Sequence, residues 1–137
     1  MHIRLAALII VIVTLFLSFN SPSKSGPDYT LLAEACLGNK GGMSHVVAAC
    51  TTLMAGEEVS LEGQSRLLRA RGWAYYCGKQ YDKAILDYTD VVALRPNDSN
   101  ALLNRAMAYD AMDNSRSSEK DYSKALLLDP NNAYALF

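Results

Sequence analysis

Apolar residues recur every three or four positions through the middle of the chain, which is the pattern of helices that bury one face. This spacing predicts one helix over residues 65–78 and a second over 81–94, separated by a Gly-Lys-Gln break. Pro96 ends the second helix, and Asp98 or Ser99 can cap the helix that follows. The chain is therefore predicted to be all-α, built from antiparallel helix hairpins.

The same pattern then repeats after 34 residues, because residues 65–98 align on residues 99–132 without a gap. Both blocks close alike, with Leu-Arg-Pro-Asn in the first and Leu-Asp-Pro-Asn in the second. Small residues recur where the backbones of the two helices in a hairpin are expected to cross closely, with tyrosines beside them. A repeat of this length is typical of stacked hairpins that bury their apolar faces on one another.

These features resemble the tetratricopeptide repeat family. The resemblance rests on the period and on a signature: a small residue and Tyr on the first helix, then a small residue, an aromatic and a closing Pro around the second. The signature residues are Gly72, Tyr75, Ala84, Tyr88 and Pro96, then Ala106, Tyr109, Ser118, Tyr122 and Pro130. Arg71 and Arg105 depart from it, because the family usually has Leu there. The resemblance implies hairpins stacked as a short α-solenoid.

The two repeats divide the chain into five parts. These are a signal or anchor (1–23), a linker with a degenerate first hairpin (24–64), the two repeats (65–98 and 99–132) and the start of a further helix or a truncated cap (133–137). In the degenerate hairpin, the pattern of a second helix is carried by Val46, Val47, Cys50 and Leu53. A loop longer than the repeat allows is expected after it, over residues 55–62. The last segment leaves open a short cap, a segment that docks on a partner, or a truncated fragment of a longer repeat protein.

The N-terminus has the pattern of an export signal. Leu5–Phe19 is apolar apart from Thr14 and Ser18, follows Arg4, and precedes a stretch rich in Ser and Pro. As a helix at ~1.5 Å per residue it falls short of a ~30 Å hydrocarbon core, which favours a cleaved signal. No Ala-x-Ala-like site follows, so an uncleaved anchor and a buried core helix stay open. A signal or an anchor would place the repeats outside the cytoplasm, in the periplasm or tethered to the inner membrane.

Charge narrows the range of partners only slightly. The net charge of −1 gives no electrostatic argument for nucleic acid. The sign alternates along the chain: −4 over 28–64 (one Lys, five acids), +3 over 65–97 (six basic residues, three acids) and −2 over 98–137 (four basic residues, six acids). Such a pattern fits solvated faces with surface pairs, hairpin-to-hairpin pairing, or a cationic surface in the middle of the chain.

The cysteines suggest a disulfide. Cys36 and Cys50 lie near the ends of the two helices of the first hairpin, so an oxidising compartment would favour a bridge between them. Closing a loop of about 15 residues would contribute roughly 3 kcal/mol. The alternative is that both are small buried apolar residues. Cys77 is left over and is expected to pack beside a hairpin turn, with a reactive thiol as the alternative.

The residues that could carry chemistry predict no catalysis, metal or cofactor. Only His2 and His45 could assist the cysteines, and no Cys-x-x-Cys or His-x-x-x-His spacing exists. Carboxylates at helix spacing are interpreted as solvated-face residues: Asp87 with Asp90, and Asp110 with Asp113. A thiol or redox protein using Cys36, Cys50 or Cys77 is the main alternative function.

The resemblance implies a concave groove, lined by the first helices of successive repeats, that takes a peptide or helix of another protein. The matching positions are Arg66, Arg69, Trp73, Tyr76, Asn100, Leu103, Asn104, Met107 and Asp110. In members that grip a C-terminal carboxylate, Arg69 and Asn104 would fit two places of the clamp, but Trp73 stands where an Asn is required. Trp73 is either a binding hot spot or packs against the next repeat. The expected function is a non-catalytic protein-binding scaffold of the bacterial cell envelope.

Overall fold

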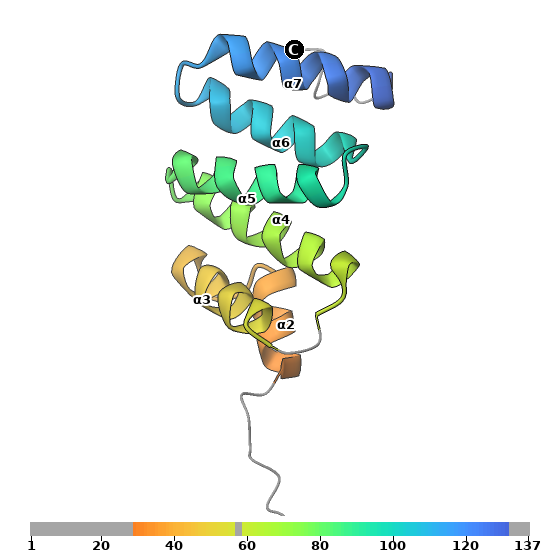
Figure 1. Ribbon diagram of the computed structural model, residues 1–137. Helices are drawn as coiled ribbons and strands as arrows, with labels where there is room; N and C mark the ends of the chain where they lie inside the picture. Colours follow the sequence, from red (N-terminus) through yellow and green to blue (C-terminus); the bar gives the residue numbers. More distant parts are fainter. Residues whose placement is uncertain (1–28, 57–58, 132–137) are drawn as a thin grey trace, which may run out of the picture.

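The computed structural model describes residues 29–56 and 59–131, which form an all-α stack of three helix hairpins (Figure 1). The helices are α2 (Tyr29–Leu37), α3 (Met43–Met54), α4 (Leu61–Cys77), α5 (Tyr81–Leu94), α6 (Ser99–Asp110) and α7 (Ser115–Leu128). This confirms the predicted fold class. The predictions made for residues 1–23 and 133–137 lie outside the described residues.

All three hairpins turn in the same way. Each turn holds one non-glycine residue in the left-handed region: Asn39, Lys79 and Asp113, with φ of 52°, 59° and 57°. In the second turn the Gln80 amide donates to the Tyr75 carbonyl at 2.9 Å, which satisfies a carbonyl at the end of α4. The equivalent bonds run from Lys40 to Ala35 and from Asn114 to Tyr109. The degenerate first hairpin has therefore kept the first part of this turn, which Gly41 and Gly42 then lengthen with φ of 93° and 85°.

Helix α4 begins earlier than the apolar pattern predicts, at Leu61 rather than at residue 65. The Ser60 hydroxyl caps it by accepting a hydrogen bond from the Gly63 amide at 3.1 Å. The added turn is largely polar, and Leu61 is 71% exposed, so no buried periodicity marks it. The loop expected over 55–62 therefore ends at Ser60.

The close crossing of α4 and α5 explains the small residue at position 72. A Cβ atom added to Gly72 would lie 2.9 Å from Cε1 of the Tyr88 ring, and Tyr88 is fully buried. The ring therefore occupies the space that a larger side chain would need. At the equivalent positions of the next repeat, Ala106 is fully buried and Tyr122 is only partly buried.

A buried ion pair joins the two helices of each full repeat. Arg105 donates two hydrogen bonds to the Asp121 carboxylate, at 2.6 and 2.8 Å, and a third to the Thr89 hydroxyl of the preceding hairpin at 3.2 Å. The hydrogen bond to Asp121 raises the pKa of Arg105. The same three contacts in the preceding repeat are made by Arg71, Asp87 and Thr51. Arg at the position of the usual Leu thus links each full repeat to the hairpin before it. The interpretation of Asp87 as a solvated-face residue was wrong, because its side chain is buried in this ion pair.

The first hairpin is joined by a disulfide instead. Cys36 on α2 and Cys50 on α3 are bonded and almost fully buried, in a core shared with Val46, Ala49 and Leu67. The predicted bridge is therefore present in the structure. It holds α2 against α3 in the hairpin that lacks the Arg–Asp pair of the full repeats.

Candidate binding groove

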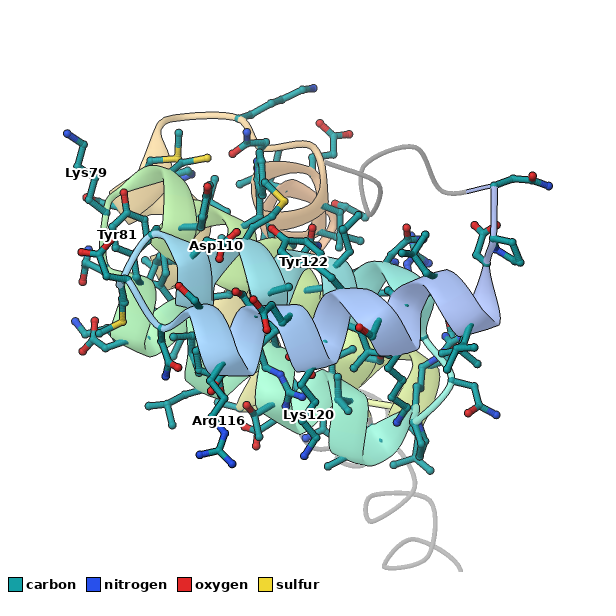
Figure 2. All side chains as sticks on the ribbon, turned by 90° about the horizontal axis from the view of Figure 1, so that it is seen from above. Lys79, Tyr81, Asp110, Arg116, Lys120 and Tyr122 are labelled. Atoms are coloured by element: carbon teal, nitrogen blue, oxygen red, sulfur yellow. A yellow bond between two sulfur atoms is a disulfide. The ribbon has the colours of Figure 1, made fainter. Side chains whose placement is uncertain are left out.

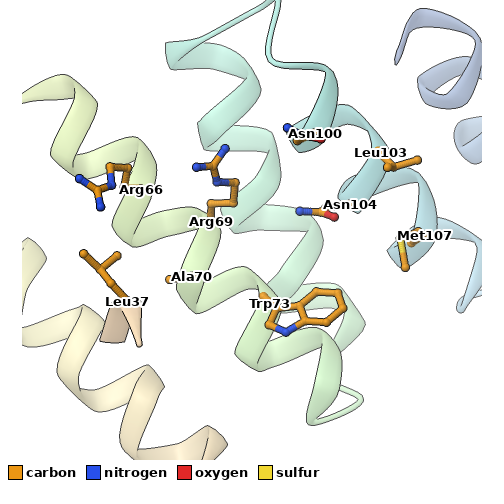
Figure 3. Close-up of a pocket in the computed structure, with 9 residues that line it drawn as sticks. All are labelled: Leu37, Arg66, Arg69, Ala70, Trp73, Asn100, Leu103, Asn104 and Met107. Carbon is orange, nitrogen blue, oxygen red and sulfur yellow. The ribbon is translucent and has the colours of Figure 1, made fainter. Parts of the chain in front are cut away.

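A groove of about 690 Å³ is lined by residues of α4 and α6 and by Leu37 at the end of α2 (Figure 3). Its lining consists of Leu37, Arg66, Arg69, Ala70, Trp73, Asn100, Leu103, Asn104 and Met107. The crossing geometry at Gly72 and the Arg–Asp–Thr contacts hold the two walls at a fixed spacing. The groove is therefore a product of how the repeats stack, not of a single helix.

Seven of the nine residues predicted for the groove line it: Arg66, Arg69, Trp73, Asn100, Leu103, Asn104 and Met107. Two lining residues were missed. Ala70 lies four positions after Arg66 and three before Trp73, so helical spacing alone could have found it. Leu37 belongs to the degenerate hairpin, where no signature residue marks the register.

The other two predicted residues, Tyr76 and Asp110, lie next to the groove rather than in its lining. The Tyr76 ring stacks on Trp73, with centroids 5.5 Å apart and planes at 16°. The Asp110 carboxylate accepts a hydrogen bond from the Tyr122 hydroxyl at 3.0 Å, and these two side chains lie together on α6 and α7 (Figure 2). Both residues therefore lie beyond Trp73, adjacent to that end of the groove.

Trp73 presents an exposed aromatic surface in the groove wall. It is 40% exposed, and the ring that stacks on it belongs to its own helix rather than to the next repeat. A large aromatic that stays half-exposed inside a concavity is typical of contact surfaces. Met107 and Leu103 across the groove add further apolar surface.

The two groove arginines differ in their partners. Arg69 Nη1 lies 3.4 Å from Oδ2 of Asp98, whose other oxygen caps α6 by accepting from the Ala101 amide. Arg66 makes no ion pair or side-chain hydrogen bond within residues 29–56 and 59–131. Arg66 is therefore a free cation at the groove, whereas Arg69 is partly neutralised.

The asparagines of the groove are also open. Across the described part of the chain, the side-chain amides of Asn100 and Asn104 have no hydrogen-bond partner. Each amide offers two donors and one acceptor to a ligand. The polar groups of the groove can therefore bind a peptide backbone or a carboxylate.

The described residues do not assemble a site for metal or thiol chemistry. No described group of His, Cys, Asp or Glu could hold a metal ion. Cys77 is free and exposed at the end of α4, while Cys36 and Cys50 are buried in their bridge. A buried disulfide is a poor substrate for exchange because the attacking thiolate needs access to sulfur. None of the described helices is long and apolar enough to span a membrane.

Stacked hairpins around an open groove define an α-solenoid of the kind that binds other proteins. Models of the tetratricopeptide repeat family match residues 65–98 and residues 99–132. The chain is therefore a tetratricopeptide repeat protein, and this family is non-catalytic. The matched ranges coincide with the two self-similar blocks in the sequence.

Solved structures share the fold. The first tetratricopeptide domain of Spaghetti (RPAP3), bound to the HSP90 peptide SRMEEVD, is 25% identical with a TM-score of 0.68, over 79% of this chain and 84% of that one. A tetratricopeptide repeat protein from Parabacteroides merdae is 19% identical with a TM-score of 0.64, over 97% of this chain and 51% of that one. The mitochondrial import receptor subunit TOM70 of Rattus norvegicus is 31% identical over 85 residues. That alignment covers 58% of this chain and only 14% of TOM70.

Proposed function

We propose that this chain is a non-catalytic binding module that holds an extended segment of another protein in the groove between α4 and α6. The observation that carries the proposal is the exposed surface of Trp73 in a groove that also contains Arg66, which has no ion-pair partner among the described residues. An aromatic anchor beside an arginine, which a ligand would bury, is a common composition of a binding hot spot. The similar Spaghetti domain bound to an HSP90 peptide supports a peptide as the ligand.

The groove chemistry favours a segment with a carboxylate near Arg66 and an apolar side chain near Leu103 and Met107. A clamp for a C-terminal carboxylate, considered for Arg69 and Asn104, is incomplete here. Arg69 is engaged by Asp98, and Trp73 takes the place of an asparagine. We therefore propose side-chain carboxylates within the segment as the anionic contact, with Arg66 as their main partner.

The substitution Trp73→Ala tests the proposal. Immobilised peptides from an acidic and apolar array would be probed with the wild-type chain and with the variant. We expect Trp73→Ala to weaken binding about tenfold or more, the range of a hot-spot truncation, while helical circular dichroism and Tm stay unchanged. Leu86→Ala is the control, because Leu86 is also a large exposed apolar residue but lies on α5 outside the groove. A large fall in Tm, or equal binding by both variants, would count against the proposal.

We also propose that the module works outside the bacterial cytoplasm, in the cell envelope. The apolar segment Leu5–Phe19 after Arg4 supports export, and a buried disulfide is typical of oxidising compartments. The test is cell fractionation followed by alkylation and peptide mapping without reduction. The expected result is an envelope fraction in which Cys36 and Cys50 resist alkylation. Recovery in the cytoplasm with both thiols alkylated would refute it.

A further inference from the structure

Beyond Trp73 the groove leads to a cluster of aromatic rings around one carboxylate. We call Trp73, Tyr76, Tyr81, Tyr122 and Asp110 the aromatic end. Tyr76 stacks on Trp73, and Tyr81 lies against Tyr76 with ring centroids 5.4 Å apart at 59°. The hydroxyl of Tyr122 donates to Asp110 at 3.0 Å.

The stacking of the repeats brings these groups together. Tyr76 and Asp110 occupy the same position in successive repeats, at the ends of the neighbouring helices α4 and α6. Burial is the main cause that raises the pKa of Tyr76, and the nearby Asp110 charge adds to it. The same carboxylate, after burial, helps to raise the pKa of Tyr122 to about 12. Asp110 therefore lies within electrostatic reach of both rings.

No cation within the described residues forms an ion pair with the cluster. Among the described residues Asp110 takes part in no ion pair. Lys83 lies over a different ring, that of Tyr75, at 5.5 Å. In Figure 2, Lys79 projects from the α4–α5 turn, well apart from Asp110 in that view, and no ion pair joins the two. Trp73 stays 40% exposed despite its stack on Tyr76, and Asp110 Oδ1 has no hydrogen-bond partner among the described residues, so both can receive a positive group.

We propose that the aromatic end binds the cationic side chain of a lysine or arginine in the partner segment, an inference that rests on the proposed function of the groove. Trp and Tyr faces attract ammonium and guanidinium groups through their quadrupole, with Trp the strongest. The Asp110 carboxylate supplies the opposite charge. Because Arg66 lies at the other end of the groove, the ligand has an acidic and a basic residue in fixed order.

The geometry also sets the spacing of those two charges. Arg66 and Tyr76 are ten positions apart on α4 (76 minus 66), which corresponds to ~15 Å along the helix at ~1.5 Å per residue. An extended segment rises ~3.3 Å per residue, so it crosses this distance in about four or five residues. The apolar side chain between the charges then faces Leu103 and Met107.

Blocked synthetic peptides of about twelve residues test this, each with one Glu, a central Leu and one Lys, at Glu–Lys spacings between about two and ten residues. Trp73 is the only tryptophan of the chain, so its fluorescence reports occupancy of the groove directly. We expect the tightest binding at a spacing of about four or five residues, and an about fivefold loss when norleucine replaces Lys. Asp110→Asn should weaken the Lys peptide about as much and leave the norleucine peptide unchanged. Asp82→Asn, at an exposed acid on α5, is the matched control.

The outcomes separate this inference from the proposed function. If Lys and norleucine peptides bind the wild-type chain equally, the groove binds peptides but the cationic subsite is refuted. Equal weakening of both peptides by Asp110→Asn, or a best spacing near ten residues as for a helical ligand, also overturns it. If no peptide changes Trp73 fluorescence at about millimolar concentration, the proposed function fails and this inference fails with it.

Discussion

The substitution Arg105→Leu tests whether the buried ion pair holds the two repeats together. It restores the residue that tetratricopeptide repeats usually have at this position. Leu is a good helix former and is similar in volume to Arg, so neither helix propensity nor packing volume opposes the change. It also removes both hydrogen bonds to Asp121 and the bond to Thr89 on the preceding hairpin. If packing alone decided stability, the variant would be neutral or more stable.

The structure predicts a loss instead. The Asp121 side chain is only 6% exposed, so without Arg105 a carboxylate remains buried with no compensating charge. Removing one partner of a buried pair costs about 3–5 kcal/mol. Arg105 reaches solvent at its edge, and water can partly replace it, so we expect a loss of about 2–4 kcal/mol in the free energy of unfolding.

Urea unfolding followed by circular dichroism would measure this. Arg116→Leu is the matched control, since Arg116 is exposed on α7 and makes no ion pair with a described residue (Figure 2). The double variant Arg105→Leu with Asp121→Leu removes both charges and should recover most of the loss, because a buried pair replaced by apolar residues is often neutral. A loss below about 1 kcal/mol for the single variant, or additive losses in the double variant, would refute the reasoning.

Other predictions follow from single contacts. Tyr88→Phe should raise the free energy of unfolding by up to about 1 kcal/mol in urea, because the buried hydroxyl has no partner among the described residues; a loss would show that it is hydrogen-bonded. Lys79→Gly should raise the free energy of unfolding by about 0.5–1 kcal/mol, and Tm with it, because Gly adopts the left-handed φ of 59° without strain; an unchanged Tm would argue against strain in the turn. Reduction of the Cys36–Cys50 bridge should cost roughly 3 kcal/mol in urea unfolding, whereas the same reductant should leave a Cys36→Ala, Cys50→Ala variant unaffected. Burial first, and then the hydrogen bond to Asp110, raise the pKa of Tyr122 to about 12. The stability that its neutral hydroxyl contributes is therefore complete below pH ~10 and is lost as the pH rises towards 12. Tyr122→Phe should reduce this alkaline loss of Tm.

The sequence predicts most of the fold because each hairpin packs locally. The signature residues Gly72 and Tyr88 lie on the two helices of one hairpin and meet where these helices cross, and the same residue types recur at the repeat period. The start of α4 at Leu61 escaped prediction because the first helical turn is set by a cap at Ser60 and buries little apolar surface. Apolar periodicity reports burial, so it misses helical turns that lie in solvent.

The groove was predictable where the repeat register applies and not elsewhere. Trp73 and Asn104 follow from their positions on the first helices, but Leu37 comes from a hairpin whose signature has been lost. The Arg–Asp ion pair could have been predicted by comparing the charged positions of the two repeats. Arg71 precedes Asp87 by sixteen positions, and Arg105 precedes Asp121 by the same interval. A charge pair that recurs with the repeat is a structural contact in both copies.

These contacts connect stability to binding. The wall formed by α4 and the wall formed by α6 belong to different repeats, and Arg105 bridges them to the preceding hairpin through Thr89. Leu37, which also lines the groove, is adjacent to Cys36 and so is held by the disulfide. A ligand that touches both walls stabilises the stack in proportion to its affinity, since it binds only the folded arrangement. Loosening the stack by the loss of the Arg105 contacts should therefore weaken every groove ligand together, whereas changes at Trp73 or Asp110 should discriminate between ligands.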